Sequence, residues 1–198
     1  MKNSNNLDLK LLTKESITGA LLFLMETKEY GKISITDICN RAGVSRNAFY
    51  RNYPAKDAIL RRYLYEVTDV WRRELRNISR LTTQQYFTIL FEQSAKQKEL
   101  VKKMIAAGIE YLLIDVFFTF FRNFTLNARK PSYWQCHFAG SIYAIFIHWI
   151  MNNQPETAEE LGLMVCKFNH FPPDLRLKLP PPIDIEELMN ISTFTYRE

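Results

Sequence analysis

The stretch ISITDICNRAGVSRNAFYRNYPAKDAIL, residues 33–60, decides the fold of the N-terminal part of the chain. Ser34 is followed three residues later by Asp37, which is the spacing of a capping box at the start of a helix. Gly43 can end that helix, and Ser45 can cap the next one. Two short helices joined by a glycine-containing turn predict a helix-turn-helix.

Positive charge is concentrated in the same region. Residues 41–62 include six basic side chains and one acidic side chain, whereas the net charge of the whole chain is only +5. A run of basic side chains can simply be a solvent-exposed face of the protein without a partner. Beside a helix-turn-helix it favours an anionic partner such as nucleic acid, because the second helix of this motif enters the DNA major groove.

The second helix of the motif carries side chains suited to this task. We expect Ala48 and Phe49 to face the core. Arg46 can donate two hydrogen bonds to guanine and Asn47 can pair with adenine, each worth roughly 1–3 kcal/mol of discrimination. Nearby hydroxyl, amide and ammonium groups suit phosphates, which position a protein without reading sequence. The predicted DNA-binding residues are Ser34, Ser45, Arg46, Asn47, Tyr50, Arg51, Asn52 and Lys56.

The rest of the chain has a helical pattern. Apolar residues recur at helical spacing almost throughout, and only six glycines occur. We expect a first helix that Thr13 caps and that ends near Glu29–Gly31, where Gly31 can terminate it. A long helix over residues 55–78 should connect two domains. The proline-containing residues 169–198 are expected to form an extended tail, in which Asp184 can cap a further helical turn or two.

Several classes of protein are disfavoured by the sequence. The three cysteines, Cys39, Cys136 and Cys166, are widely spaced and predict neither disulfides nor a zinc site. The polar N-terminus lacks a signal core, and the most apolar segments are short or interrupted, so we expect a cytoplasmic protein without a membrane partner. No phosphate loop, nucleophile motif or metal constellation is present, so we expect no enzyme, cofactor or metal.

The N-terminal residues also follow a longer order, Ile35-x-x-Ile38-x-x-x-Ala42-Gly43-Val44-Ser45-x-x-x-Phe49-Tyr50-x-x-Tyr53-x-x-Lys56-x-x-Ile59-Leu60. This order resembles the DNA-binding domain of the TetR/AcrR family of bacterial transcription regulators, over about residues 11–60. Tyr53 stands where the family more often has Phe, so we expect its hydroxyl to reach water or a phosphate.

The resemblance implies an all-α protein with three parts. Residues 1–54 would be a three-helix helix-turn-helix domain, residues 55–168 a larger helical domain for effector binding and dimerisation, and residues 169–198 a C-terminal tail. Two recognition helices of a homodimer would meet successive major grooves of a palindromic operator, about 34–36 Å apart. A small-molecule effector in the larger domain would typically release the protein from DNA, which is the behaviour of a repressor.

Two sets of residues are candidates for these roles in the larger domain. Aromatic side chains can line a pocket for an apolar or aromatic effector, although a helical stripe of aromatics is more often plain core. These candidates are Tyr86, Tyr111, Phe117, Phe118 and Phe121.

Small residues at four-residue spacing in 133–152 allow a second helix to approach closely, so we assign a dimer interface to them. The alternative is a helix buried within one subunit. The interface candidates are Gly140, Ser141, Ala144, Ile145 and His148. A different function also stays open, in which this domain binds a protein partner rather than a small ligand.

Overall fold

The computed structural model describes residues 2–124, 133–177, 179 and 184–190. These residues form helices, with an isolated bridge between Thr82 and Arg176 but no strand, so the all-α prediction is confirmed. The chain divides into two compact units, Met1–Leu64 and Tyr65–Glu198. The division falls inside the long connecting helix and not at residues 54 and 55, where the sequence placed it.

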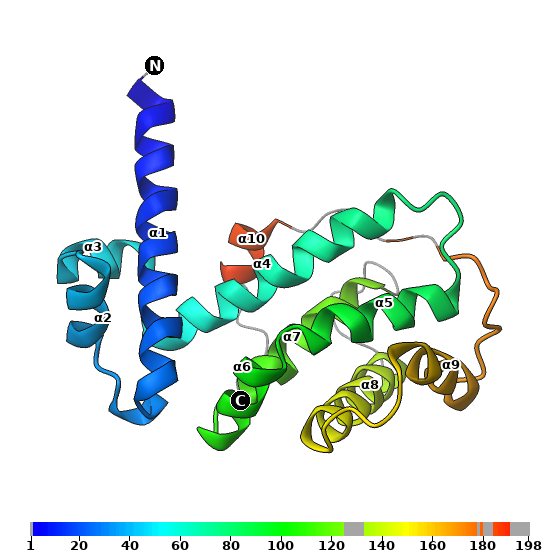
Figure 1. The fold of residues 1–198 in the computed structure, drawn as a ribbon. Coiled ribbons are helices and arrows are strands. Elements are labelled where there is room, and N and C mark those ends of the chain that lie inside the picture. Colours follow the sequence, from blue (N-terminus) through cyan, green and yellow to red (C-terminus); the bar gives the residue numbers. More distant parts are fainter. Residues whose placement is uncertain (1, 125–132, 178, 180–183, 191–198) are drawn as a thin grey trace. The chain divides into compact units, whose positions relative to one another are not determined.

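The first unit contains α1 (Lys2–Thr27), a 3-10 turn (Tyr30–Lys32), α2 (Ile35–Ala42), α3 (Arg46–Asn52) and the first part of α4 (Lys56–Arg76) (Figure 1). α2 and α3 lie beside α1 and are much shorter than it. Helices of this length are unstable in isolation, so their stability must come from packing.

The core of the first unit collects side chains from each helix. Ile17, Leu21, Ile38, Phe49 and Ile59 have no exposed surface. Burying a side chain of this size stabilises a fold by roughly 1.5–3 kcal/mol. The shared core therefore holds two helices that could not persist alone.

Two sequence predictions for α1 are wrong. Thr13 lies within the helix and does not cap it, because its hydroxyl donates to the Leu9 carbonyl at 2.7 Å. The helix ends at Thr27, and Gly31 belongs to the 3-10 turn that follows. A threonine hydroxyl can bond to a carbonyl one turn back as well as cap an N-terminus, so its presence does not locate the start of a helix.

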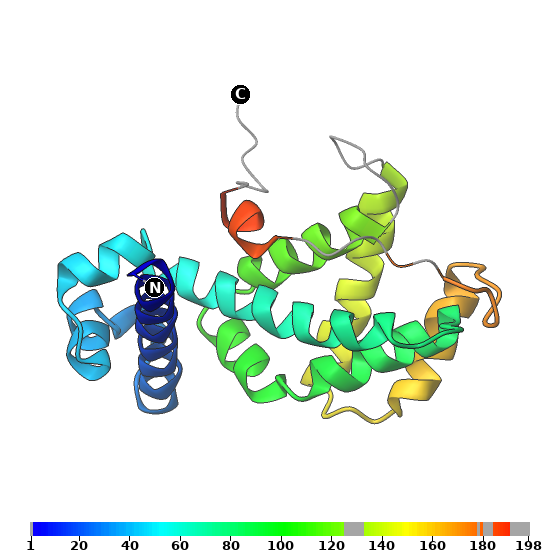
Figure 2. The same ribbon diagram turned by 90° about the horizontal axis from the view of Figure 1, so that it is seen from above.

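The second unit contains the remainder of α4 and a group of further helices (Figure 2). They are α5 (Thr83–Ala95), α6 (Lys98–Ala106), α7 (Tyr111–Phe124), α8 (Tyr133–Met151), α9 (Ala158–Phe168) and α10 (Ile185–Asn190). α5 packs along α9, and α7 packs against α8. Within the described ranges, no helix is both long enough and apolar enough to cross a membrane.

Part of the C-terminal segment that the sequence predicted to be an extended tail pairs with the start of α5. The Thr83 amide donates to the Leu175 carbonyl and the Leu177 amide donates to the Leu81 carbonyl, both at 2.9 Å. These bonds satisfy backbone groups at the start of α5. The prediction that Asp184 caps a further helix is confirmed, because its carboxylate accepts a hydrogen bond from the amide of Glu186 in α10 at 2.8 Å.

The contact between α5 and α9 yields a testable prediction. A Cβ atom at Gly162 would lie 2.6 Å from the Thr88 hydroxyl oxygen and 2.9 Å from the Thr88 amide nitrogen, so the two helices must separate to admit it. We expect Gly162→Ala to lower the free energy of unfolding by roughly 1–3 kcal/mol. Urea unfolding followed by far-UV circular dichroism measures this change.

Gly19→Ala is the matched control. Gly19 lies within α1, and a Cβ atom there meets nothing within 4 Å. Since alanine favours a helix over glycine, this variant should be as stable as wild type or more stable by about 1 kcal/mol. Equal stability of Gly162→Ala and wild type would show that α5 and α9 do not depend on this close approach.

Candidate nucleic-acid interface

The turn between α2 and α3 is built as the sequence predicted. The Ser34 hydroxyl accepts from the Asp37 amide at 3.1 Å while the Asp37 carboxylate accepts from the Ser34 amide at 2.8 Å, so the capping box is complete. Gly43 ends α2 at φ 66°, in the left-handed region that glycine adopts without steric cost. Ser45 caps α3 by accepting from the Ala48 amide at 3.1 Å.

One side of α3 is buried and the other is exposed. Phe49 has no exposed surface, whereas Arg46, Asn47, Tyr50 and Arg51 are exposed. The Tyr50 ring stands edge-on to Phe49, with 5.4 Å between ring centroids, which restrains its direction. α3 therefore holds two cations, an amide and a phenol where a large ligand can reach them.

The two capping serines differ in what they can offer a ligand. The Ser34 hydroxyl donates to the Asp37 carboxylate at 2.8 Å, so its proton is already used. The Ser45 hydroxyl accepts from the backbone and is exposed. A hydroxyl that accepts one bond can still donate another, so Ser45 is the better placed of the two for a phosphate.

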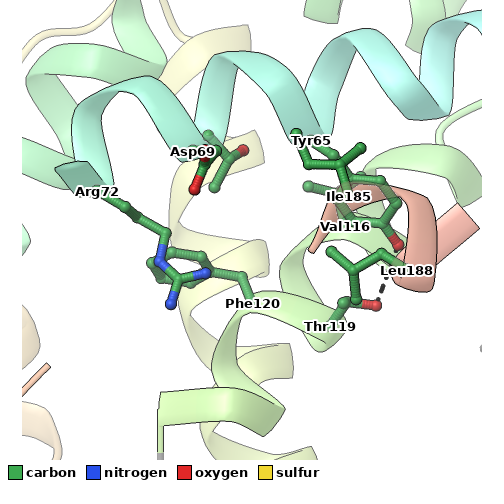
Figure 3. Close-up of a pocket in the computed structure, with 9 residues that line it drawn as sticks. Tyr65, Asp69, Arg72, Val116, Thr119, Phe120, Ile185 and Leu188 are labelled. Carbon is green, nitrogen blue, oxygen red and sulfur yellow. Dashed lines mark hydrogen bonds between the residues drawn. The ribbon is translucent and has the colours of Figure 1, made fainter. Parts of the chain in front are cut away.

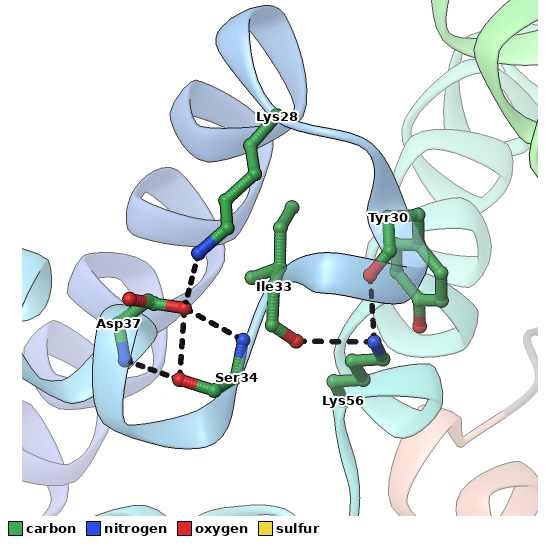
Figure 4. A network of polar contacts seen from close by, with 6 residues as sticks. All are labelled: Lys28, Tyr30, Ile33, Ser34, Asp37 and Lys56. Atoms are coloured by element: carbon green, nitrogen blue, oxygen red, sulfur yellow. Dashed lines mark hydrogen bonds and ion pairs between the residues drawn. The ribbon is translucent and has the colours of Figure 1, made fainter.

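Lys56 has a structural role that the sequence did not reveal. Its ammonium donates to the carbonyls of Tyr30 at 2.7 Å and Ile33 at 3.1 Å, and it lies 4.2 Å from the centroid of the Tyr30 ring (Figure 4). Burial lowers the pKa of this ammonium. Two of its three N–H groups thus fasten the turn between α1 and α2 to the start of α4.

Asn52 and Tyr53 differ from the sequence predictions. The Asn52 amide donates to the Ala48 carbonyl at 2.7 Å and its side-chain oxygen is buried, so this side chain turns back onto α3, which argues against a phosphate contact. Tyr53 is 1% exposed, and its hydroxyl lies 3.3 Å from the Thr18 hydroxyl. The expectation that it reaches water or a phosphate was wrong, because α1 supplies a partner from a distant part of the sequence.

Asp37 is the centre of a small charged network (Figure 4). Besides the bonds of the capping box, its carboxylate accepts from the Lys28 ammonium at 2.7 Å. The bond from Lys28, followed by those from Ser34, holds the pKa of this carboxyl well below its usual range. The network joins the end of α1 to the start of α2.

The five aromatic residues predicted to line an effector pocket differ in burial within the described part of the chain. Tyr86 and Phe121 are buried in the core of the second unit, with 0% and 1% exposure. Phe117 and Phe118 are half-buried, and Tyr111 is 47% exposed. The sequence alone could not separate core aromatics from pocket aromatics, because both types follow the same helical spacing.

A small cavity lies elsewhere in the second unit, where α4, α7 and α10 meet (Figure 3). Its volume is about 20 Å³. Its polar lining includes Tyr65, Asp69 and Arg72 of α4 and Thr119 of α7. The sequence did not predict these cavity residues, because nothing in the pattern of α4 distinguishes a buried arginine from an exposed one.

The residues assigned to dimerisation lie on the outer side of α8. Ala144 and His148 are exposed, and Gly140, Ser141 and Ile145 are half-buried. Described parts of the same chain therefore cover this face only in part. In addition, the described residues contain no group of three or more His, Cys, Asp or Glu side chains that could hold a metal ion.

The fold and this surface define a helix-turn-helix protein with a second helical domain. The family described as "Bacterial regulatory proteins, tetR family" matches residues 17–63. The N-terminal helix-turn-helix part of the chain therefore matches the TetR family, in agreement with the resemblance seen in the sequence.

Two known proteins are similar to the chain. The HTH-type transcriptional regulator EthR of Mycolicibacterium smegmatis is 46% identical over 37 residues, which are 19% of this chain and 17% of EthR. The crystal structure of Thermus thermophilus FadR, a TetR-family transcriptional repressor in complex with lauroyl-CoA, has a TM-score of 0.51. It is 17% identical, and the match covers 86% of this chain and all of FadR. At that identity the similarity establishes the fold.

The charged network gives a prediction for pH dependence. A carboxyl whose pKa is lowered by folding stabilises the fold above its ordinary pKa and loses this contribution as the pH falls below about 4. We expect Asp37→Ala to be less stable than wild type by the same amount at pH 7 and pH 5, and the difference to shrink below about pH 4. Urea unfolding at pH 7, 5 and 3 measures it.

Asp37→Asn is the control for the cap, since its amide oxygen can still accept from backbone N–H groups while it carries no charge. It should fall between wild type and Asp37→Ala at pH 7. A stability difference that stays constant from pH 7 to 3 would contradict the ionic part of this account.

Proposed function

We propose that the chain is a transcription regulator that binds a palindromic operator as a homodimer and represses until a small molecule binds its second unit. The observation that carries this proposal is the exposed side of α3, where Arg46, Asn47, Tyr50 and Arg51 surround a buried Phe49. A recognition helix needs this division between an anchored side and a polar side.

The roles proposed for these side chains follow from their chemistry. Arg46 donates to the two acceptors of guanine, and Asn47 pairs with adenine. Tyr50, Arg51 and Ser45 contact phosphates. Lys56 has one N–H group beyond its two bonds to carbonyls and is a weaker candidate for a phosphate.

Dimerisation is proposed through the outer side of α8. Exposed apolar side chains extend this side beyond the small residues, since Tyr133 is 97% exposed and Met151 48% exposed. Phe168 of α9 is also exposed. Large apolar side chains that stay exposed are frequent at protein interfaces.

Response to a small molecule is proposed from the second unit. FadR, which shares the fold, was solved in complex with lauroyl-CoA. In the cavity between α4, α7 and α10, buried polar groups surround open space. Both observations support a ligand-responsive domain rather than a purely structural one.

The DNA-binding role is tested by fluorescence anisotropy with DNA from around the protein's own gene. We expect tight binding that random competitor DNA does not remove. Arg46→Ala should weaken binding by about 5- to 150-fold, because one base contact contributes roughly 1–3 kcal/mol. Tyr50→Ala should weaken it to a smaller extent.

Arg80→Ala is the charge-matched control, because Arg80 is exposed in the loop after α4. It should bind like wild type. Equal binding by Arg46→Ala, Tyr50→Ala and Arg80→Ala would remove α3 from DNA recognition. Competitor-sensitive binding by the wild type would favour a function through a protein partner.

The dimer is tested by a charge on α8. Ala144→Glu places a carboxylate on the proposed interface, and we expect the variant to run as a monomer in sedimentation velocity at concentrations where wild type is dimeric. Burying an unpaired charge costs several kcal/mol, enough to dissociate a typical dimer. Ala106→Glu, at an exposed site on α6, should stay dimeric. A dimeric Ala144→Glu protein would move the interface elsewhere.

A further inference from the structure

The cavity between α4, α7 and α10 is lined by two buried charges. Asp69 is 7% exposed and Arg72 is 6% exposed. They are three residues apart on α4 and therefore share the side of the helix that faces α7 (Figure 3). On the same side, the Tyr65 hydroxyl donates to the Thr119 hydroxyl of α7 at 3.2 Å.

The Arg72 guanidinium forms no hydrogen bond or ion pair among the described residues, although the Asp69 carboxylate is close enough to stabilise its charge. The central carbon of the guanidinium lies 5.2 Å from the centroid of the Phe120 ring. Burial is the main cause that lowers the pKa of this group; Arg76 lowers it further, while Tyr86 and Asp69 raise it. A buried cation without a hydrogen-bonded anion is costly, so such a site favours an anion from outside.

Asp69 also has unused bonding capacity. One carboxylate oxygen accepts from Arg73, from Nε at 2.7 Å and from the terminal nitrogen at 2.6 Å. The other oxygen is buried and has no hydrogen-bond partner in the described residues. The cavity thus presents both a cation that lacks an acceptor and an acceptor that lacks a donor.

Apolar side chains of α10 cover this polar surface. Ile185 and Leu188 complete the lining, and Leu188 is 6% exposed. The remaining volume of about 20 Å³ is enough for one water molecule. A larger ligand must replace these side chains. Since α10 has only six residues, it can be displaced at a lower cost than the long helices.

We propose that this cavity binds a small apolar acid that carries a hydrogen-bond donor next to its carboxylate, which is the chemistry shared by apolar amino acids and hydroxy acids. The ligand's carboxylate accepts from Arg72, its donor group bonds to the free oxygen of Asp69, and its apolar body takes the place of Leu188. That this ligand acts as an effector rests on the proposed function. That it binds in the cavity does not depend on that function.

A series of ligands with one carbon skeleton tests the proposal by titration calorimetry on the full chain. L-leucine and 2-hydroxy-4-methylpentanoate carry both groups, 4-methylpentanoate lacks the donor, and 3-methylbutylamine lacks the carboxylate. We expect the first two to bind, 4-methylpentanoate to bind about tenfold more weakly, and the amine not to bind. The stronger of the first two identifies an amino acid or a hydroxy acid as the source.

Variants test the contribution of Arg72 separately from that of Leu188, which covers the cavity. Arg72→Met keeps the length of the side chain and should weaken binding by roughly 10- to 150-fold, whereas Arg80→Met should leave it unchanged. Leu188→Ala removes a competing side chain, so we expect binding about tenfold tighter. Circular dichroism checks that Arg72→Met folds. If it does not, Arg72→Lys should fold and bind more weakly, because lysine cannot form the two-pronged contact with a carboxylate.

Two results would overturn the proposal. One is an absence of binding heat for the whole series with both wild type and Leu188→Ala, which would leave the charges bridged by water only. The other is equal binding by Arg72→Met and wild type. Fluorescence anisotropy with DNA on the same samples distinguishes the ligand site from the DNA-binding function. DNA binding without ligand binding overturns the ligand site alone. Ligand binding without DNA binding overturns the proposed function alone.

Discussion

Burial of the Phe49 side chain is the interaction on which the N-terminal unit depends. α3 has seven residues, far fewer than a helix needs to persist alone in water. Phe49, with no exposed surface, fixes one side of α3 in the core shared with Ile17, Leu21 and Ile38. Because that side is held, the opposite side can keep charged and polar groups in solvent. The cap at Ser45 and the turn at Gly43 set the direction in which those groups point.

A second set of contacts holds this arrangement to its surroundings. Asp37 links α2 to Lys28 at the end of α1. Lys56 links the turn between α1 and α2 to the start of α4. Both residues are charged, and both use their charge to satisfy groups of the chain itself. The basic character of the region therefore has two origins. Arg46 and Arg51 are exposed, while Lys56 largely serves the fold.

In the second unit, some of the charged side chains are buried, whereas Arg46 and Arg51 of the first unit are exposed. Its core is rich in aromatic contacts, such as Tyr86 with Phe87 and Trp71 with Phe120, and these contacts need no ligand. The unusual feature is the pair of buried charges Asp69 and Arg72 beneath α10, where one Asp69 oxygen has no hydrogen-bond partner in the described residues. Natural cores rarely keep such groups unless a water molecule, an ion or a ligand compensates them. This contrast separates the supporting part of the unit from its candidate site.

The sequence by itself determined the helix-turn-helix. The capping box at Ser34, the left-handed Gly43 and the cap at Ser45 depend on residues within four positions of one another, so their spacing is visible in the chain. Only the tertiary structure decided the surroundings: the partner of the Tyr53 hydroxyl, the carbonyls that hold Lys56, the burial of Arg72 and the pairing of residues 175 and 177 with the start of α5. Each of these joins residues far apart along the chain or depends on which side of a helix is covered, and helical periodicity specifies neither.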